Sequence, residues 1–340
     1  MTIRGVIGMK RCQATAIWVA ILFLVCAVAI GLPNEALAKE AVTIRIASAF
    51  EPLHILCRSA EKFKTMVEER SNGEIKVELF LGGVMGSEEE VTEAVSIKAV
   101  EMQAGGGLPI QMYAPKYYFL DSPYVIKDWE HFKRVFNGEL GQRAQEEVLK
   151  NGNTMYLGVV YRGLRHFTSN KPVRTPEDLK GIKLRLPQLP TWVAVWKELG
   201  ALPVPIALTE LFTALQTGVA DASEGDVTQI HSFHLFEVQK YLSLTGHLVQ
   251  TGALTINKPF FDSLSEEHQK IVKEAGLEAA EWGSQQILSG EEDIIEDLKA
   301  KGMEVITPDA EAFREKARPA VERLFKEQWT VTTWDEVLSY

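Results

Sequence analysis

Alternating apolar and polar residues predict a βαβ unit early in the chain. Residues 43–46 alternate in this way, which is typical of a half-buried strand. Between residues 56 and 67, apolar side chains recur every three or four positions, which predicts an amphipathic helix. Alternation returns at residues 75–79. Because strand, helix and strand follow one another within about forty residues, the two strands are expected to be parallel with a right-handed crossover.

The rest of the chain continues as an α/β pattern. Ser87 with Glu90 and Ser263 with Glu266 have the capping-box spacing that begins a helix. A helix that begins at the second box and extends to about residue 299 is long enough to lie along two lobes. The 340 residues suffice for two lobes of ordinary domain size. Further strands are predicted at 155–161, 182–186 and 303–306, and further helices at 208–218 and 313–329.

The first 38 residues have the layout of a secretory signal peptide. Arg4, Lys10 and Arg11 precede an almost wholly apolar stretch at residues 14–32, and Ala36-Leu37-Ala38 supplies small residues for cleavage. An uncleaved membrane anchor is the alternative, because the apolar stretch approaches the length of a spanning helix. The cleavage site favours export, with removal of residues 1–38.

Charge and cysteine content narrow the function further. The whole chain has a net charge of −10, and removal of residues 1–38 leaves 33 basic and 45 acidic residues, a net charge of −12. Nucleic-acid binding requires basic surface, so this acidic balance argues against it. Only Cys57 remains after cleavage, which excludes an intramolecular disulfide, and its helical position predicts a small buried side chain.

The sequence lacks the common signatures of catalysis and cofactor binding. It contains no G-x-S-x-G, H-E-x-x-H, Walker or C-x-x-C motif. His231 and His234 are three positions apart, but no third ligand lies nearby, so a helix-surface role is favoured over a metal site. No cofactor and no metal ion are expected.

Arginines at the ends of predicted strands are the strongest candidate chemistry. In residues 182–186, Ile182, Leu184 and Leu186 share one face of the strand, so Arg185 points from the other face just before Pro187. Ligands of open α/β sheets bind beyond the carboxyl ends of strands, and a guanidinium matches the oxygen pair of a carboxylate or sulfonate. A solvated edge position remains an equal alternative for Arg185.

A second pair of arginines follows the strand predicted at residues 155–161. Arg165 is a candidate second contact to an anion, and Gly163 allows close approach of the backbone. Arg162 is expected on the surface.

These residues belong to a series of sequence blocks that resembles a known family. The chain is similar to the substrate-binding subunits of tripartite ATP-independent periplasmic (TRAP) transporters, in the dicarboxylate-binding DctP branch, from about residue 42 to about residue 329. The blocks are GLRHFTSN (163–170), TPEDLKGIKLRLP (175–187), LGA (199–201), PVP (203–205), ELFTALQTGVAD (210–221) and FEVQKYL (236–242).

The resemblance implies two α/β lobes with mixed sheets flanked by helices, joined by crossing strands and a long helix that spans both lobes. We expect residues 39–162 with part of 251–290 in lobe I, and 163–250 with 291–340 in lobe II. The lobes close on the ligand. The resemblance also implies a periplasmic monomer that delivers its ligand to a small and a large integral membrane subunit, driven by an ion gradient.

The resemblance further assigns roles to individual residues. Arg185 forms the main salt bridge to the acid group of the ligand, and Arg165 is a second contact. Glu88 contacts the far end of the ligand, and the loop from Ser48 to His54 lines the cleft.

One block departs from the family pattern. Where many members have Gln-Glu-Asn-Pro, this chain has Ser223-Glu224-Gly225-Asp226, so Gly225 replaces an asparagine that helps to hold a carboxylate. Glu224 and Gly225 are therefore candidate ligand contacts, with a ligand preference that differs from that of C4-dicarboxylate binders.

The predicted ligand is a small organic anion, either a carboxylate or a short sulfonate such as isethionate, for which space at Gly225 would suit the tetrahedral head. Two alternatives use the same cleft: a periplasmic enzyme with Glu88 or Glu224 as base, and a ligand-sensing subunit.

Overall fold

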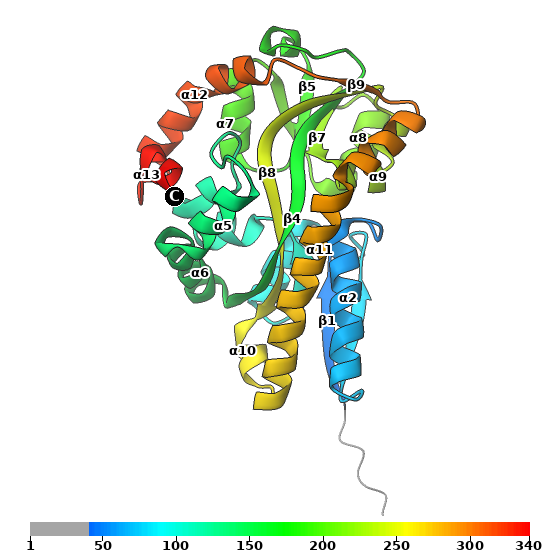
Figure 1. Cartoon of the computed structure of the whole chain (residues 1–340), viewed down its shortest axis with the longest axis vertical. Coiled ribbons are helices and arrows are strands. Elements are labelled where there is room, and N and C mark those ends of the chain that lie inside the picture. The colour runs from blue at the N-terminus through cyan, green and yellow to red at the C-terminus, as the bar shows by residue number, and fades with distance from the viewer. Residues whose placement is uncertain (1–40) are drawn as a thin grey trace, which may run out of the picture. The chain divides into compact units, whose positions relative to one another are not determined.

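The computed structural model describes residues 41–340, which are organised around one mixed sheet of nine strands (Figure 1). The strand order is β2-β1-β3-β8-β4-β7-β5-β6, and β9 pairs with β8. The predicted signal peptide, residues 1–38, lies outside the described residues. The strands are β1 (Val42–Ala47), β2 (Ile75–Phe80), β3 (Met102–Gly105), β4 (Thr154–Ser169), β5 (Lys183–Leu186), β6 (Leu202–Pro205), β7 (Ala222–Asp226), β8 (Tyr241–Asn257) and β9 (Glu304–Ile306).

The first lobe begins with the predicted βαβ unit. Strands β1 and β2 are parallel, and helix α2 (Ile55–Arg70) connects them. Ile44 and Ile46 are fully buried in the hydrophobic core, as their alternation predicts. Cys57 is buried in α2, which confirms its role as a core residue.

Two long antiparallel strands, β4 and β8, join the lobes. Their pairing extends from Thr154 with Asn257 to Ser169 with Tyr241, so both strands pass from one lobe into the other (Figure 1). The sequence patterns predicted only the first half of β4 and none of β8. Most of β8 is buried on both faces, and a strand of this kind lacks the alternation that reveals a half-buried strand.

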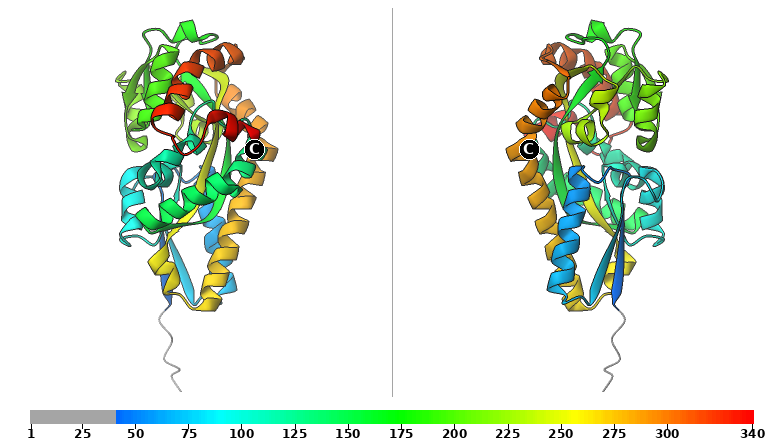
Figure 2. Two further views of the ribbon diagram at one scale, coloured as in Figure 1. Left: turned by 90° about the vertical axis from the view of Figure 1, so that its left-hand side faces the viewer. Right: turned by 90° about the vertical axis from the view of Figure 1, so that its right-hand side faces the viewer.

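The long predicted helix is α11 (Glu266–Ala300), which packs against α2, β4 and α9 (Val227–Ser232). Both views in Figure 2 show it passing from the level of β1 to that of the second lobe. Close packing on β4 depends on glycine: a Cβ at Gly158 would lie 2.7 Å from the carbonyl oxygen of Gly276. The predicted capping box at Ser263 is wrong, because Ser265 is the N-cap and its side chain accepts from the N–H of His268.

The remaining helices cover the sheet on both sides. The second lobe contains β5, β6 and β7 with α7 (Pro190–Leu199), α8 (Leu211–Gln216) and α9 around them (Figure 1). His231 on α9 contacts Asp297 on α11, with Nε2 and Oδ2 2.8 Å apart. The other helices are α3 (Glu88–Ser96), α4 (Leu108–Tyr113), α5 (Trp129–Asn137), α6 (Glu139–Gly152), α10 (Lys258–Asp262), α12 (Ala310–Glu327) and α13 (Trp334–Ser339), with short 3-10 turns at Pro115–Asp121, Pro176–Leu179, Leu208–Glu210 and Leu235–Glu237.

Candidate ligand-binding site

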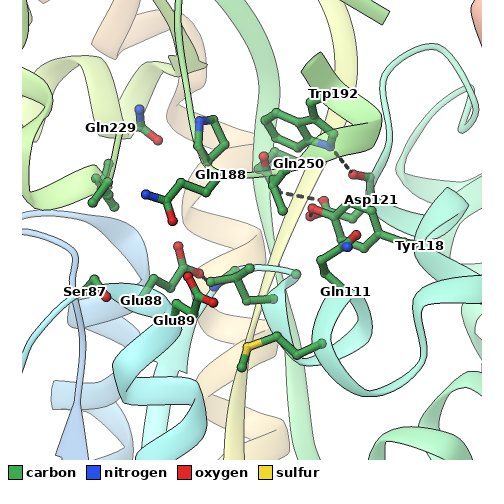
Figure 3. Close-up of a pocket in the computed structure, with 18 of the residues that line it drawn as sticks. Ser87, Glu88, Glu89, Gln111, Tyr118, Asp121, Gln188, Trp192, Gln229 and Gln250 are labelled. Atoms are coloured by element: carbon green, nitrogen blue, oxygen red, sulfur yellow. Dashed lines mark hydrogen bonds between the residues drawn. The ribbon is translucent and has the colours of Figure 1, made fainter. Parts of the chain in front are cut away.

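A cavity of about 380 Å³ lies between residues of the two lobes. This volume is within the range of small-molecule binding pockets. Figure 3 shows Glu88, Glu89 and Gln188 on one side of the cavity, and Tyr118, Asp121 and Gln111 on another. The other polar side chains of its wall belong to Ser87, Arg162, Arg165, Arg185, Trp192, Gln229 and Gln250.

Arg185 is a buried cation in this wall. It follows the alternating residues of β5, and only 1% of it is exposed. Its Nε and Nη2 donate to the carbonyl oxygen of Ile206 at 3.0 and 2.7 Å, which leaves three of the five guanidinium N–H groups for another acceptor. Burial lowers the pKa of Arg185 to about 10. Among residues 41–340 no carboxylate forms an ion pair with Arg185, so its charge is buried without a direct partner.

Arg165 also lines the cavity, but its guanidinium is already bound by the protein. Its Nη2 donates to Oε1 of Glu224 at 2.7 Å, its Nε donates to Oε2 of the same carboxylate, and its Nη1 donates to Gln250 at 2.7 Å. The ring of Trp192 lies 4.9 Å from the guanidinium carbon. Burial opposes the charge of Arg165, but the Glu224 carboxylate outweighs it and the pKa is raised. Arg165 is therefore fixed in position before a ligand arrives.

The prediction that Arg162 lies on the surface is wrong. The residue is 2% exposed, and its Nη2 lies 2.6 Å from Oδ2 of Asp226. The register of β4 against β8 shifts between Tyr161 and Gly163, and Gly163 has a positive φ of 94°. A bulge of this kind interrupts the alternation of side chains, so Arg162 and Arg165 both reach the cavity.

Glu224 and Gly225 do not line the cavity. Glu224 is fully buried behind Arg165 and also lies 3.1 Å from Nε2 of His247. Burial by itself would raise the pKa of the Glu224 carboxyl. The opposite effect of Arg165 and His247 is larger, and the pKa falls to about 2. Gly225 lies behind the side chain of Gln229. Glu224 and Gly225 therefore act on the site indirectly, through Arg165 and Gln229, which line the cavity.

Ser48 and His54 also lie behind the wall, although their loop contributes Phe50 to it. The hydroxyl of Ser48 donates to the carbonyl oxygen of Ala104 at 2.7 Å. The ring of His54 stacks on Phe50, and its Nδ1 accepts from the N–H of Leu56 at 3.2 Å. Burial lowers the pKa of His54 to about 4. These side chains hold the loop in place.

Glu88 does face the cavity, from the first turn of α3 (Figure 3). The predicted capping box of Ser87 and Glu90 begins this helix. The N–H of Gly106 donates to Oε1 of Glu88 at 2.5 Å. Burial raises the pKa of the Glu88 carboxyl, while this hydrogen bond and the arginines oppose the rise. The side chain offers a hydrogen-bond acceptor to a bound molecule.

A network around Asp121 was missed by the sequence patterns. Its Oδ1 accepts from Nε2 of Gln250 at 2.9 Å, and its carbonyl oxygen accepts from Nε1 of Trp192 at 2.8 Å (Figure 3). Tyr118 donates to Oδ2 at 3.2 Å. Burial raises the pKa of Asp121 to about 6. These residues come from a 3-10 turn, α7 and β8, so only the tertiary fold brings them together.

Residues 41–340 contain no cluster of three or more His, Cys, Asp or Glu side chains that would hold a metal ion. No helix within the same range combines the length and the apolar character that crossing a membrane requires.

Two lobes with a buried, partly unsatisfied arginine in the cavity between them define a solute-binding protein. The chain belongs to the DctP family, described as bacterial extracellular solute-binding protein, family 7, whose model matches residues 46–328. This match confirms the resemblance stated above and the two-lobe α/β fold. Proteins of this family are the solute receptors of TRAP transporters.

Individual relatives support the assignment over most of the chain. The 2,3-diketo-L-gulonate-binding periplasmic protein of Escherichia coli is 32% identical over 269 residues, covering 78% of this chain and 82% of that protein. A TRAP periplasmic solute-binding protein of Roseobacter denitrificans, solved with L-galactonate, is 30% identical with a TM-score of 0.83, covering 88% and 100% of the two chains. One from Polaromonas, bound to D-erythronate, is 28% identical with a TM-score of 0.80, covering 88% and 97%.

Proposed function

We propose that this chain is the periplasmic receptor of a TRAP uptake system and that it binds a small organic acid through Arg185. The observation that carries the proposal is the buried guanidinium of Arg185, which lines the cavity and has no carboxylate partner in the described part of the chain. A buried charge is costly unless it is paired. The acid group of a ligand would supply the missing negative charge and accept the free N–H groups.

The ligand that we favour is a hydroxy carboxylate of sugar-acid size. The cavity of about 380 Å³ is within the range of small-molecule pockets and has room for a six-carbon aldonic acid. The side chains of Glu88 and Glu89 face the cavity and would accept hydrogen bonds from hydroxyl groups. L-galactonate and D-erythronate, bound by the two solved relatives, have this chemistry.

A short sulfonate such as isethionate has less support. Its tetrahedral head would need free space beside Gly225. The amide of Gln229 fills that space, since its Nε2 would lie 2.7 Å from a Cβ at Gly225. Isethionate would also leave much of the cavity empty.

The alternative of an enzyme that uses Glu88 or Glu224 as base has weaker support as well. Glu224 is bound to Arg165 and lies behind the cavity wall. The relatives reported above are binding proteins by name. Turnover of a bound acid by the purified protein would favour the enzyme. A sensing subunit would bind the same acid and differ only in its membrane partner.

The wider proposal follows from membership in the family. The protein would act as a monomer in the periplasm, after loss of residues 1–38, and would deliver its ligand to the small and large membrane subunits. Residues 39–162 with part of 251–290 and residues 163–250 with 291–340 would move as the two lobes. Closure of these lobes would bury the ligand against Arg185.

The test is a binding screen of the exported protein, unfolded and refolded to release any acid that co-purifies. L-galactonate, D-galacturonate, D-erythronate, succinate and isethionate would be compared by thermal shift and then by calorimetry. A ligand at 100 times its Kd stabilises a protein by about 2.7 kcal/mol, which is readily measured. We expect at least one hydroxy acid to bind, and Arg185→Lys to weaken it because lysine lacks the planar fork.

Arg143→Lys is the matched control, because Arg143 is an exposed residue in a surface ion pair. Full affinity of the Arg185→Lys variant would contradict the role of Arg185. Binding of isethionate alone would overturn the hydroxy-acid assignment but leave the receptor function intact.

A further inference from the structure

One buried amide in the cavity wall has no hydrogen-bond partner for its nitrogen. Gln229 is 2% exposed and lines the cavity, and its Nε2 is unpaired within residues 41–340. Figure 3 shows the amide oxygen of Gln229 on the side nearer Gln188 and the nitrogen on the far side. A buried donor without a partner is rare in proteins because it is costly.

The backbone of Gln229 is held firmly although its side-chain amide is not. Gln229 is in the first turn of α9, and its N–H donates to Oδ1 of Asp226 at 2.9 Å. Asp226 is in turn bound by Arg162. The backbone of Gln229 is therefore held by a carboxylate that belongs to a buried ion pair, whereas the nitrogen of its amide has no hydrogen bond within residues 41–340.

Gly225 creates the space that this amide occupies. A Cβ at Gly225 would lie 2.7 Å from Nε2 of Gln229 and 3.1 Å from its Cδ. Any side chain at residue 225 would push the amide away. Gly225 is the second-last residue of β7, which is parallel to β5 where Leu184 and Ala222 are paired. Gln229 on α9 and Arg185 on β5 both line the cavity.

Two other glutamines of the wall differ in how far their amides are bound: Oε1 of Gln111 also has no partner within residues 41–340, whereas the amide of Gln250 is fully bound. Both groups of the Gln250 amide are used: Oε1 accepts from Arg165 at 2.7 Å, and Nε2 donates to Asp121 at 2.9 Å. Gln250 is therefore part of the scaffold. The nitrogen of the Gln229 amide, in contrast, has no partner within residues 41–340, so this amide can still form hydrogen bonds to a molecule in the cavity.

We propose that Gln229 determines ligand specificity by reading the hydroxyl group next to the acid group that Arg185 binds. An amide presents a donor and an acceptor side by side, as do paired contacts of glutamine to adenine. A 2-hydroxy carboxylate presents the matching acceptor and donor on neighbouring carbons. This inference rests on the proposed function and narrows the substrate class to 2-hydroxy acids.

The binding test uses D-erythronate and its 2-deoxy analogue, 3,4-dihydroxybutanoate of the same configuration. A site built to bind a hydroxyl group rejects an analogue that lacks it. We expect wild-type protein to prefer D-erythronate by about tenfold or more, and Gln229→Met to reduce this preference to less than about threefold. An unchanged preference in Gln229→Met would overturn the proposal.

A double-mutant cycle tests the role of Gly225. Gly225→Ala would displace the amide and lower the affinity for D-erythronate by about tenfold. In a Gln229→Ala background, where no amide remains to be displaced, the same change would have no further effect. Additive losses would show that Gly225 acts independently of Gln229 and would contradict the proposed pair.

A third measurement needs no ligand, so it separates failure of this inference from failure of the proposed function. If the amide of Gln229 is reserved for a ligand, Gln229→Met removes an unpaired buried donor and leaves the Tm of the ligand-free protein equal or higher by about 2 °C. If the amide is structural, the Tm falls. The control is Gln285→Met, at an exposed position on α11.

The outcomes are then distinct. If wild-type protein binds neither D-erythronate nor any other acid of the screen, the proposed function fails, and the melting experiment alone decides whether Gln229 is structural. If it binds acids with and without the 2-hydroxyl group equally well, the receptor function stands and the specificity proposal is overturned.

Discussion

Arg162 and Asp226 form an ion pair that is almost completely shielded from water, with Nη2 and Oδ2 2.6 Å apart. Asp226 is the N-cap of α9, and its Oδ1 accepts from the N–H of Gln229. The bulge in β4 that turns Arg162 inward therefore places its guanidinium against the N-cap residue of α9. Through this pair, the crossing strand β4 positions a residue of the cavity wall.

We predict that Arg162→Met destabilises the protein by about 3–5 kcal/mol, because it leaves the Asp226 carboxylate buried without its partner. The measurement is urea unfolding at pH 7. The control is Arg143→Met, which breaks the exposed pair with Glu139 and should cost less than about 1 kcal/mol. An equal decrease in the free energy of unfolding in the two variants would contradict the prediction that the buried pair matters more for stability than the exposed one.

We predict the opposite effect on stability for Arg185. Its guanidinium is buried without a carboxylate partner among the described residues, so Arg185→Met should leave the free energy of unfolding of the ligand-free protein unchanged or higher. Stabilisation by a bound acid should disappear in the same variant. Calorimetry with and without D-erythronate measures both effects. A destabilised ligand-free variant would indicate that Arg185 is structural.

Acid should destabilise the protein through its buried histidines. Burial lowers the pKa of His166 to about 3, and its Nδ1 accepts from the N–H of Gly246, so the ring is neutral in the folded state. The unfolded chain binds a proton below pH 6.5, so the stability due to neutral His166 is present above pH 6.5 and is lost as pH falls toward 3. The loss approaches about 1.4 kcal/mol per pH unit.

His166→Asn isolates this contribution, since asparagine does not titrate. Unfolding by urea at pH 7, 6 and 5 would be compared in the two proteins. We expect the stability of wild-type protein to fall more steeply with acid than that of the variant. Parallel pH profiles would contradict the assignment of a neutral buried His166.

The close packing of α11 on β4 leads to a further prediction. A Cβ at Gly276 would lie 2.5 Å from the Cβ of Leu157, so Gly276→Ala should destabilise the protein by about 1–3 kcal/mol. On the same helix, a Cβ at Gly290 meets no atom within 4 Å. Gly290→Ala should therefore stabilise the protein by about 0.5–1 kcal/mol through helix propensity. Thermal melts compare the two variants, and destabilisation by both would contradict the packing argument.

Some features of the fold and the site could be predicted from the sequence because they depend on neighbours in the chain. The period-2 pattern of residues 182–186 placed Arg185 on the face opposite Leu184, and this holds in β5. The βαβ unit and the capping box at Ser87 are likewise local patterns. Such signals survive folding because a strand or a helix presents its side chains at a regular period.

The contacts among distant residues were decided by the tertiary structure alone. The pattern placed Arg162 on the surface, but the bulge at Gly163 turned it inward, because pairing with β8 sets the register there. Glu224 became a partner of Arg165 because β4 and β7 are neighbours in the sheet. The amide of Gln229 took the space at Gly225 because α9 folds back beside β7. Packing between elements has no period in the sequence, so only the assembled fold shows which polar groups are satisfied and which remain for a ligand.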